Sequence, residues 1–371
     1  MQAFKLISRI HQFDTFKDFA KEFNLGEGDI IITNSFLYEP YMKDLNLNVP
    51  VIFQEKYGQG EPSDEMMNAM LEDIKKENFN RIIAVGGGTV VDIAKLFVLK
   101  DVNNVVDAFE KTIPIVKEKE LIIIPTTCGT GSEVTNISIA EIKSKKTKMG
   151  LAVDEITADD AVLIPEFLEG LPYKFYLTSS IDALIHAVEG YVSPKASDFT
   201  KMFSKEAIRM ILEIYMGIVE HGEDHRKEHF REMLLASNYA GIAFGNAGVG
   251  AVHALSYPLG GTYHVPHGEA NYQFFTEVFN VYNEKNPNGA IKEVNELMAE
   301  IIGSTPENVY NDLDKLLGNL LEKNQLRSYG MKEEEIEGFA DSVIATQQRL
   351  LGNNYVELSR DEIRDIYKRL Y

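Results

Sequence analysis

The pattern of apolar and polar residues changes near Pro165, and the change predicts two domains of different class. Before Pro165, short continuous apolar runs alternate with amphipathic stretches of helical period. This alternation is typical of a parallel sheet that helices cover on both faces. After Pro165 the strand signals fade, and helical periods continue to the C-terminus. The apolar runs lie at 29–33, 48–53, 81–85 and 121–125, and a clear helical stretch between them is 63–79.

We therefore predict an α/β domain over residues 1–165 and an all-helical domain over residues 166–371. Hydrophobic residues make up 44% of the 371, enough for two full cores. A formal net charge of −20 argues against nucleic acid and anionic membrane as partners, because both need clustered Lys and Arg. Neither a signal peptide nor an apolar run of about 18 residues occurs. The single cysteine, Cys128, argues against an intrachain disulfide and fits a reducing cytoplasm.

Two polar loops follow apolar runs and predict a site for an anionic cofactor. The first loop joins run 81–85 to a helical pattern, and its glycines let the backbone approach a ligand at a helix N-terminus. The second loop follows run 121–125 and presents several hydroxyl groups. Such a pair is typical of dinucleotide binding at the edge of an open α/β sheet, although a lone glycine turn is equally well explained as a tight connection. The candidate residues are Gly86, Gly87, Gly88 and Thr89 in the first loop, and Thr126, Thr127, Thr130 and Ser132 in the second.

Two more residues bear on the choice of cofactor. Asn34 follows the first apolar run, where an acid in NAD enzymes accepts hydrogen bonds from the adenosine ribose. Asn bonds a ribose too, but it does not repel a 2′-phosphate, so both NAD and NADP stay open. Lys148 closes the basic run 143–148 and is either a cofactor contact or an ordinary surface lysine.

Histidines and one carboxylate predict a metal site in the second half of the chain. The segment 248–270 carries His253, His264 and His267, and its glycines and prolines force the chain to turn, which would allow His253 and His267 to meet. Asp182 and His186 are four residues apart in an apolar helical pattern, so they share one face. An unpaired carboxylate there would be costly, and a metal ion would compensate it. One carboxylate and three imidazoles form a four-ligand set for a divalent transition metal.

A second histidine group competes with this set. His221, His225 and His229 are also spaced by four, but charged residues surround them in HGEDHRKEH. A water-exposed segment gives a metal no supporting shell, so we interpret this group as a solvated connection between helices. Cys128 is interpreted as a small residue of the second loop rather than a nucleophile, because the sequence places no base beside it.

Four motifs resemble, in order and spacing, those of the iron-containing (group III) alcohol dehydrogenases over nearly the whole chain. The resemblance implies a Rossmann-like dinucleotide-binding domain followed by an all-helical domain, an architecture shared with dehydroquinate synthase. It implies at least a homodimer and a small alcohol or aldehyde as substrate. The motifs are GGGTVVDIAK (86–95), PTTCGTGSEVT (125–135), DALIHAVEGYVS (182–193) and HALSYPLGGTYHVPHGEAN (253–271).

The resemblance also assigns roles to residues. It implies Fe(II), with Zn(II) as the alternative, on Asp182, His186, His253 and His267. It places the cofactor pyrophosphate against Gly86 to Thr89 and the nicotinamide side near Thr126, Thr127 and Thr130. It supports a cofactor role for Lys148, and Asp92 of the first motif joins Ser132 among the expected cofactor residues.

Two departures from the family pattern stand out. Many relatives carry a histidine four residues after the third ligand, as a proton relay, where this chain has Tyr257. A phenol has a much higher ordinary pKa, so Tyr257 and His264 are both candidates for the proton route. Many relatives that prefer NAD carry Asp where this chain has Asn34.

The expected reaction is the NAD(P)-linked interconversion of a small primary alcohol and its aldehyde. Over its whole length the chain most resembles members that act on 4-hydroxybutyrate and succinate semialdehyde, which makes this the expected substrate pair. The alternatives are another alcohol or diol dehydrogenase of the family, a lyase like dehydroquinate synthase, and a non-catalytic protein that binds metal or nucleotide.

Overall fold

The computed structural model describes residues 2–145 and 147–371 and shows two compact units. One unit runs from Leu6 to Leu171, and the other joins residues 2–5 to Pro172–Tyr371. Among the described residues, no helix is both long enough and apolar enough to cross a membrane.

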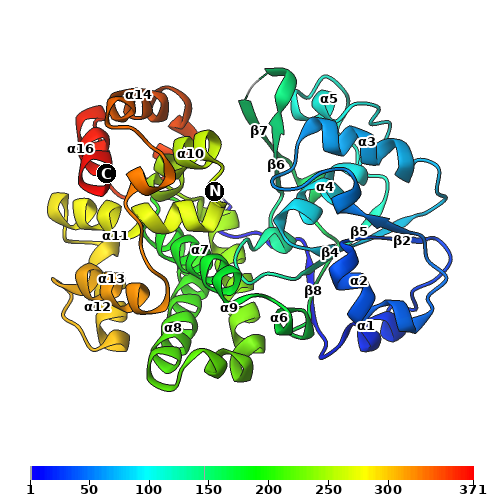
Figure 1. Cartoon of the computed structure of the whole chain (residues 1–371), viewed down its shortest axis with the longest axis horizontal. Helices are drawn as coiled ribbons and strands as arrows, with labels where there is room; N and C mark the ends of the chain where they lie inside the picture. Colours follow the sequence, from blue (N-terminus) through cyan, green and yellow to red (C-terminus); the bar gives the residue numbers. More distant parts are fainter. Residues whose placement is uncertain (1, 146) are drawn as a thin grey trace. The chain divides into compact units, whose positions relative to one another are not determined.

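A six-stranded parallel sheet organises the first unit, as predicted, with strand order β1-β8-β5-β4-β2-β3 (Figure 1). Three predicted strands are confirmed, and the run at 48–53 begins late because Pro50 lacks an N–H to donate to the ladder. Two strands at one side of the order, and an antiparallel hairpin, were not predicted. The sheet strands are β1 Arg9–Gln12, β2 Asp29–Thr33, β3 Val51–Phe53, β4 Arg81–Gly86, β5 Glu120–Pro125 and β8 Asp160–Leu163; the hairpin is β6 Ile137–Ile142 and β7 Thr147–Ala152.

Helices cover both faces of this sheet and give it two cores (Figure 1). Successive side chains of a strand point to opposite faces, so Ile30 and Ile32 join one core while Ile31 joins the other. The first core also takes α3 Asp64–Ile74, α4 Gly88–Phe97 and α5 Val105–Phe109, and the second takes α1 Phe16–Glu22, α2 Ser35–Tyr41 and α6 Glu166–Glu169. Burial on both faces explains why the central strands are continuously apolar.

The second unit is all-helical, also as predicted. Its most buried long helix is α7 Tyr173–Val192, which packs against α8 Asp198–His221, α9 Phe230–Ala247 and α11 His267–Lys285. Inside this bundle the hydroxyls of Ser180 and Tyr215 are hydrogen-bonded at 2.7 Å. The remaining helices are α10 Ala251–Tyr263, α12 Ala290–Ile302, α13 Val309–Leu320, α14 Ile336–Thr346, α15 Gln348–Leu351 and α16 Arg360–Leu370.

Candidate active site

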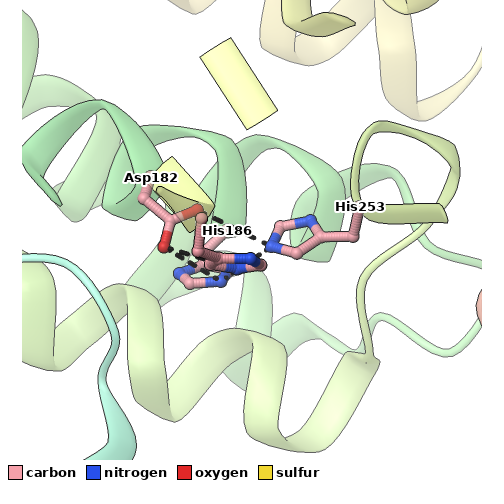
Figure 2. A group of neighbouring side chains, drawn as sticks. Asp182, His186 and His253 are labelled. Carbon is pink, nitrogen blue, oxygen red and sulfur yellow. Dashed lines mark hydrogen bonds and ion pairs between the residues drawn. The ribbon is translucent and has the colours of Figure 1, made fainter. Parts of the chain in front are cut away.

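Four side chains from three helices of the second unit converge on one point. Asp182 and His186 leave α7 one turn apart, His253 lies in the first turn of α10, and His267 is the first residue of α11. Each offers one ligand atom, and these atoms all lie within 4.8 Å of one another. Figure 2 shows Asp182, His186 and His253 directed toward the same space. The turn between α10 and α11 brings His253 and His267 together, as predicted. The position of the break was predicted wrongly in part, because Pro258, Gly260 and Gly261 lie inside α10 and the helix ends only at Tyr263.

The distances within this cluster are short and the burial is uneven. The Nε2 atoms of His186 and His253 are 3.0 Å apart, and one oxygen of Asp182 lies 3.7 Å from His253 Nε2. The other oxygen lies 3.9 Å from His186 Nε2 and 3.8 Å from His267 Nε2. Asp182, His186 and His253 are buried, whereas the side chain of His267 is 40% exposed. Three of the four candidate ligands are thus shielded from solvent, and the fourth, His267, is partly exposed to it.

The donor set fits a divalent transition metal. Imidazole nitrogens and a carboxylate oxygen are ligands that Fe(II) and Zn(II) both accept. Burial alone would raise the pKa of Asp182, but His186, His267, His253 and a hydrogen bond from Asn271 hold it below its usual value. The carboxylate is therefore ionised and ready to bind a cation. That these four residues hold the metal is a prediction that their geometry permits.

Glu189 and Asn271 support the cluster, and the sequence reasoning missed both. The Glu189 carboxylate lies 2.6 Å from His253 Nδ1 and accepts from the backbone N–H of Val252 at 2.8 Å. Asn271 donates to Asp182 at 2.7 Å and lies 3.1 Å from His267 Nε2. Their spacing was a usable signal, because Glu189 follows His186 by three residues on one helix and Asn271 follows His267 by four on another.

A close helix contact sets the position of His267. A Cβ added at Gly268 would lie 2.3 Å from the carbonyl oxygen of Thr178 in α7. Only glycine permits the start of α11 to approach α7 this closely. His267, its neighbour, thereby comes within reach of Asp182.

The competing histidine group is also partly assembled. His225, Glu228 and His229 lie in the 3-10 helix Glu223–His229 that connects α8 to α9, and their ligand atoms approach within 4.8 Å. Glu228 is exposed and both histidines are only half-buried, and His221 lies outside the group. Its solvated setting contrasts with the buried ligands of the first cluster.

The two polar loops of the first unit lie next to each other. Strand β4 ends at Gly86, where an added Cβ would fall 2.6 Å from the Cβ of Val90, so no side chain fits. Thr126 N–H donates to the carbonyl of Gly86 at 3.1 Å. Cβ atoms added at Gly87 and Gly88 would touch Thr127 and Thr130, at 3.5 and 3.4 Å. The predicted phosphate turn and the predicted nicotinamide loop thus adjoin at the carboxyl ends of neighbouring strands.

A buried network fastens the second loop to α4. The Lys95 ammonium donates to Ser132 Oγ at 2.8 Å, to Thr135 Oγ1 at 3.3 Å and to the carbonyl of Ile137 at 2.7 Å. Ser132 Oγ donates to Asp92 at 2.9 Å. Burial lowers the pKa of Lys95 to about 8, although Asp92 opposes that shift. Asp92 and Ser132 therefore have a structural task, and their direct contact with a cofactor stays a prediction.

The other candidate residues are placed as follows. Thr89 Oγ1 donates to the carbonyl of Gly60 at 2.9 Å. Lys148, on β7, forms an ion pair with Glu61. Asn34 precedes α2 and donates to side chains that follow β3.

The two candidate proton carriers both lie on or beside α10. The Tyr257 ring is half-buried, and its centroid is 6.4 Å from that of His267. His264 ends α10 in a left-handed conformation, with φ of 54°, and is exposed. The ring of Tyr257 is thus close to the metal cluster, and a role for either residue in proton transfer stays a prediction.

Comparison with known proteins gives matches along nearly all of the chain. The family model described as iron-containing alcohol dehydrogenase matches residues 5–165, and the model for the C-terminal part of the Fe-containing alcohol dehydrogenase family matches residues 176–371. A 4-hydroxybutyrate dehydrogenase of Clostridium kluyveri is 59% identical over 371 residues, which is 100% of each chain. Long-chain-alcohol dehydrogenase 1 of Geobacillus thermodenitrificans is 34% identical and covers 79% of this chain and 75% of its own. The structure of an iron-containing alcohol dehydrogenase from Thermococcus thioreducens superposes with a TM-score of 0.83 at 25% identity, covering 99% of both chains.

Proposed function

We propose that this chain, which belongs to the iron-containing alcohol dehydrogenase family, interconverts a small primary alcohol and its aldehyde with NAD as the hydride carrier. The observation that carries the proposal is the convergence of Asp182, His186, His253 and His267 within 4.8 Å in a largely buried setting. A set of three imidazoles and one carboxylate, closed on three members and open at the fourth, is suited to metal-assisted chemistry on a small ligand.

In this proposal the four residues hold Fe(II), with Zn(II) as the alternative. A divalent ion there supplies Lewis-acid chemistry, which lowers the pKa of an alcohol and stabilises negative charge on its oxygen. Glu189 keeps His253 in the tautomer whose Nε2 faces the cluster, and Asn271 orients the Asp182 carboxylate. The chain thereby fixes the directions of its ligands before any substrate arrives.

The cofactor is proposed to lie against the two adjoining loops. The backbone N–H groups of Gly87, Gly88 and Thr89, at the start of α4, bind the pyrophosphate. Thr126, Thr127 and Thr130 orient the nicotinamide side, and hydride transfer is the chemistry of the cofactor itself. Asp92, Ser132 and Lys148 complete the proposed cofactor set. Tyr257 or His264 carries the alcohol proton.

The substrate we propose is the pair 4-hydroxybutyrate and succinate semialdehyde. Identity of 59% over the full length of a protein named 4-hydroxybutyrate dehydrogenase supports this choice. We further propose that the protein acts as a homo-oligomer of at least two copies, as its family resemblance suggests. We also propose that it acts in the cytoplasm, which its single cysteine fits.

An anaerobic assay of the purified protein with added Fe(II) tests the proposal. It compares 4-hydroxybutyrate, 1,4-butanediol and ethanol, each with NAD and with NADP, by the absorbance of the reduced nicotinamide. We expect net reduced cofactor and the highest kcat/KM with 4-hydroxybutyrate. Equal kcat/KM values for all three alcohols would overturn 4-hydroxybutyrate as the preferred substrate and leave the alcohol dehydrogenase activity intact. No net reduction with any alcohol would favour a lyase like dehydroquinate synthase, which regenerates its cofactor, or a non-catalytic binding protein.

A further inference from the structure

Three neighbouring strands of the first unit bring distant residues to one edge of the sheet. Strand β2 lies between β4 and β3 and is parallel to both. The carboxyl ends of these strands are therefore side by side. The glycine turn follows β4, Asn34 follows β2, and Gln54 and Glu55 follow β3. In a doubly wound sheet, the strand next to the phosphate loop ends where the adenosine ribose binds.

Asn34 is held at that position by two side chains from the 3-10 turn Gln54–Lys56, which follows β3. Its amide nitrogen donates to Gln54 Oε1 at 3.1 Å and to Glu55 Oε2 at 3.0 Å. These two bonds use the full donor capacity of the amide, which leaves the carbonyl oxygen of Asn34 as its acceptor. Gln54 is fixed in turn, since its amide nitrogen donates to the carbonyl of Gly58 at 2.9 Å. Asn34 is thus turned into an acceptor, the role that an aspartate plays at this position in NAD enzymes.

Glu55 brings a negative charge to the same place. Its Oε1 accepts from the backbone N–H of Ser35 at 2.8 Å, at the first residue of α2. Burial would raise the pKa of Glu55, but hydrogen bonds from Ser35 and Asn34 bring it below its usual value. No lysine or arginine within residues 2–145 and 147–371 forms an ion pair with it. The carboxylate is half-buried, ionised and not neutralised by a cation.

We propose that Glu55 selects NAD over NADP, through its own charge and through the orientation it gives Asn34. A 2′-phosphate on a ribose at this position would meet the carboxylate, and like charges in a poorly solvated setting repel. The Ser35 N–H, which a phosphate could otherwise use, already belongs to Glu55. The sequence alone left this choice open, because the acid comes from the 3-10 turn after β3, 21 residues away, rather than from position 34. The proposal rests on the dinucleotide function proposed above.

Binding of NADH and NADPH without any substrate tests the proposal, and it requires no turnover. The wild type is compared with Glu55→Gln, which keeps an acceptor for Ser35 N–H but removes the charge. Glu39→Gln is the matched control, since Glu39 lies on α2, the helix that begins at Ser35, is exposed and pairs with its neighbour Lys43 at 2.6 Å. The readouts are the two dissociation constants from nicotinamide fluorescence, with thermal unfolding as a check that each variant is folded.

We expect the wild type to bind NADH more tightly than NADPH. In Glu55→Gln the ratio of the NADPH to the NADH dissociation constant should fall about tenfold, mainly because NADPH binds more tightly. Glu39→Gln should keep the wild-type ratio. An unchanged ratio in Glu55→Gln, an equal change in both variants, or a wild type that prefers NADPH would overturn the role of Glu55 while leaving the dehydrogenase function intact. A wild type that binds neither nucleotide would overturn the proposed function and this inference with it.

Discussion

The Nδ1 atom of His253 lies 2.6 Å from a carboxylate oxygen of Glu189, and each residue is only 2% exposed. The second oxygen of Glu189 is held by the Val252 N–H at 2.8 Å, so the acid cannot turn away. A carboxylate at Nδ1 places the imidazole proton there and leaves Nε2 for other partners. Glu189 therefore fixes the orientation of His253 within the cluster of Asp182, His186, His253 and His267, although it is not one of the four candidate ligands.

Exchanging Glu189 for Gln tests this support. Glutamine keeps the shape but loses the charge, and the proton of His253 is no longer fixed on Nδ1. We expect metal affinity to fall about 10- to 100-fold with the fold retained. Titration of the metal-free protein with Fe(II) or Zn(II) measures the change. Glu213→Gln, on the exposed face of α8, is the control and should bind as the wild type does; equal affinities in both variants would refute a supporting role for Glu189.

Replacing Gly268 by Ala tests the close approach of α11 to α7. The new methyl group would lie 2.3 Å from the Thr178 carbonyl oxygen, so the backbone must shift. We expect a loss of about 1–3 kcal/mol in the free energy of unfolding, measured by urea denaturation. Gly261→Ala is a matched control on α10, because no atom lies within 4 Å of its added Cβ. If both substitutions are equally harmless, the contact does not constrain the start of α11.

Lys95 predicts a specific dependence of stability on pH. The unfolded chain holds this proton up to about pH 10.5, whereas the folded protein releases it above about pH 8. Between these values the unfolded state binds more protons, so the contribution of Lys95 to the free energy of unfolding rises with pH. The free energy of unfolding of the wild type minus that of Lys95→Met should therefore rise, by about 2 kcal/mol between about pH 7 and about pH 9.5. Urea unfolding at about pH 7 and about pH 9.5 measures it.

A control variant and a contrary result define the limits of the Lys95 prediction. Lys100→Met changes an exposed lysine of the same unit and should show no such growth between the two pH values. A wild-type advantage at Lys95 that shrinks as pH rises would mean that the buried amine keeps its proton, contrary to the direction given by its burial.

Replacing His221, His225 and His229 together by Ala distinguishes the two histidine groups. The second group lies in a solvated connection, so we expect kcat and KM within about twofold of the wild type. Steady-state kinetics and metal content of the purified triple variant are the measurements. If the triple variant lost activity or bound metal, the metal site would have to be assigned to His221, His225 and His229 instead.

The sequence was sufficient for the central strands because their apolar runs are continuous. β2 reads DIIIT and β5 reads ELIIIP, runs that are typical of strands buried on both faces. β1 reads RIHQ, with one apolar residue in four, and is stabilised by pairing with β8 and by the ion pair of Arg9 with Asp160 at 2.7 Å. A four-residue segment with this composition carries no alternation or apolar run from which a strand could be predicted.

The site was predictable to the extent that its chemistry is local in sequence. The spacing of Asp182 and His186, and the broken segment after His253, were enough to group four residues. The tasks of Glu189 and Glu55 depend on which residues become neighbours in space: α7 with α10 in one case, and β2 with β3 in the other. Hydrophobic periodicity does not encode these pairings at the level of single side chains.

Metal content of His267→Ala is the most direct test of the central claim, that these four residues hold the metal of a dehydrogenase. His267 begins its helix and its side chain is 40% exposed, so its loss should leave the fold and the thermal unfolding temperature nearly unchanged. The wild type and His221→Ala should each retain about one metal ion per chain after loading with Fe(II) and desalting, as a single four-ligand site requires. His267→Ala should retain less than about a tenth of that and show no turnover. A His267→Ala protein with the metal content of the wild type would contradict the account.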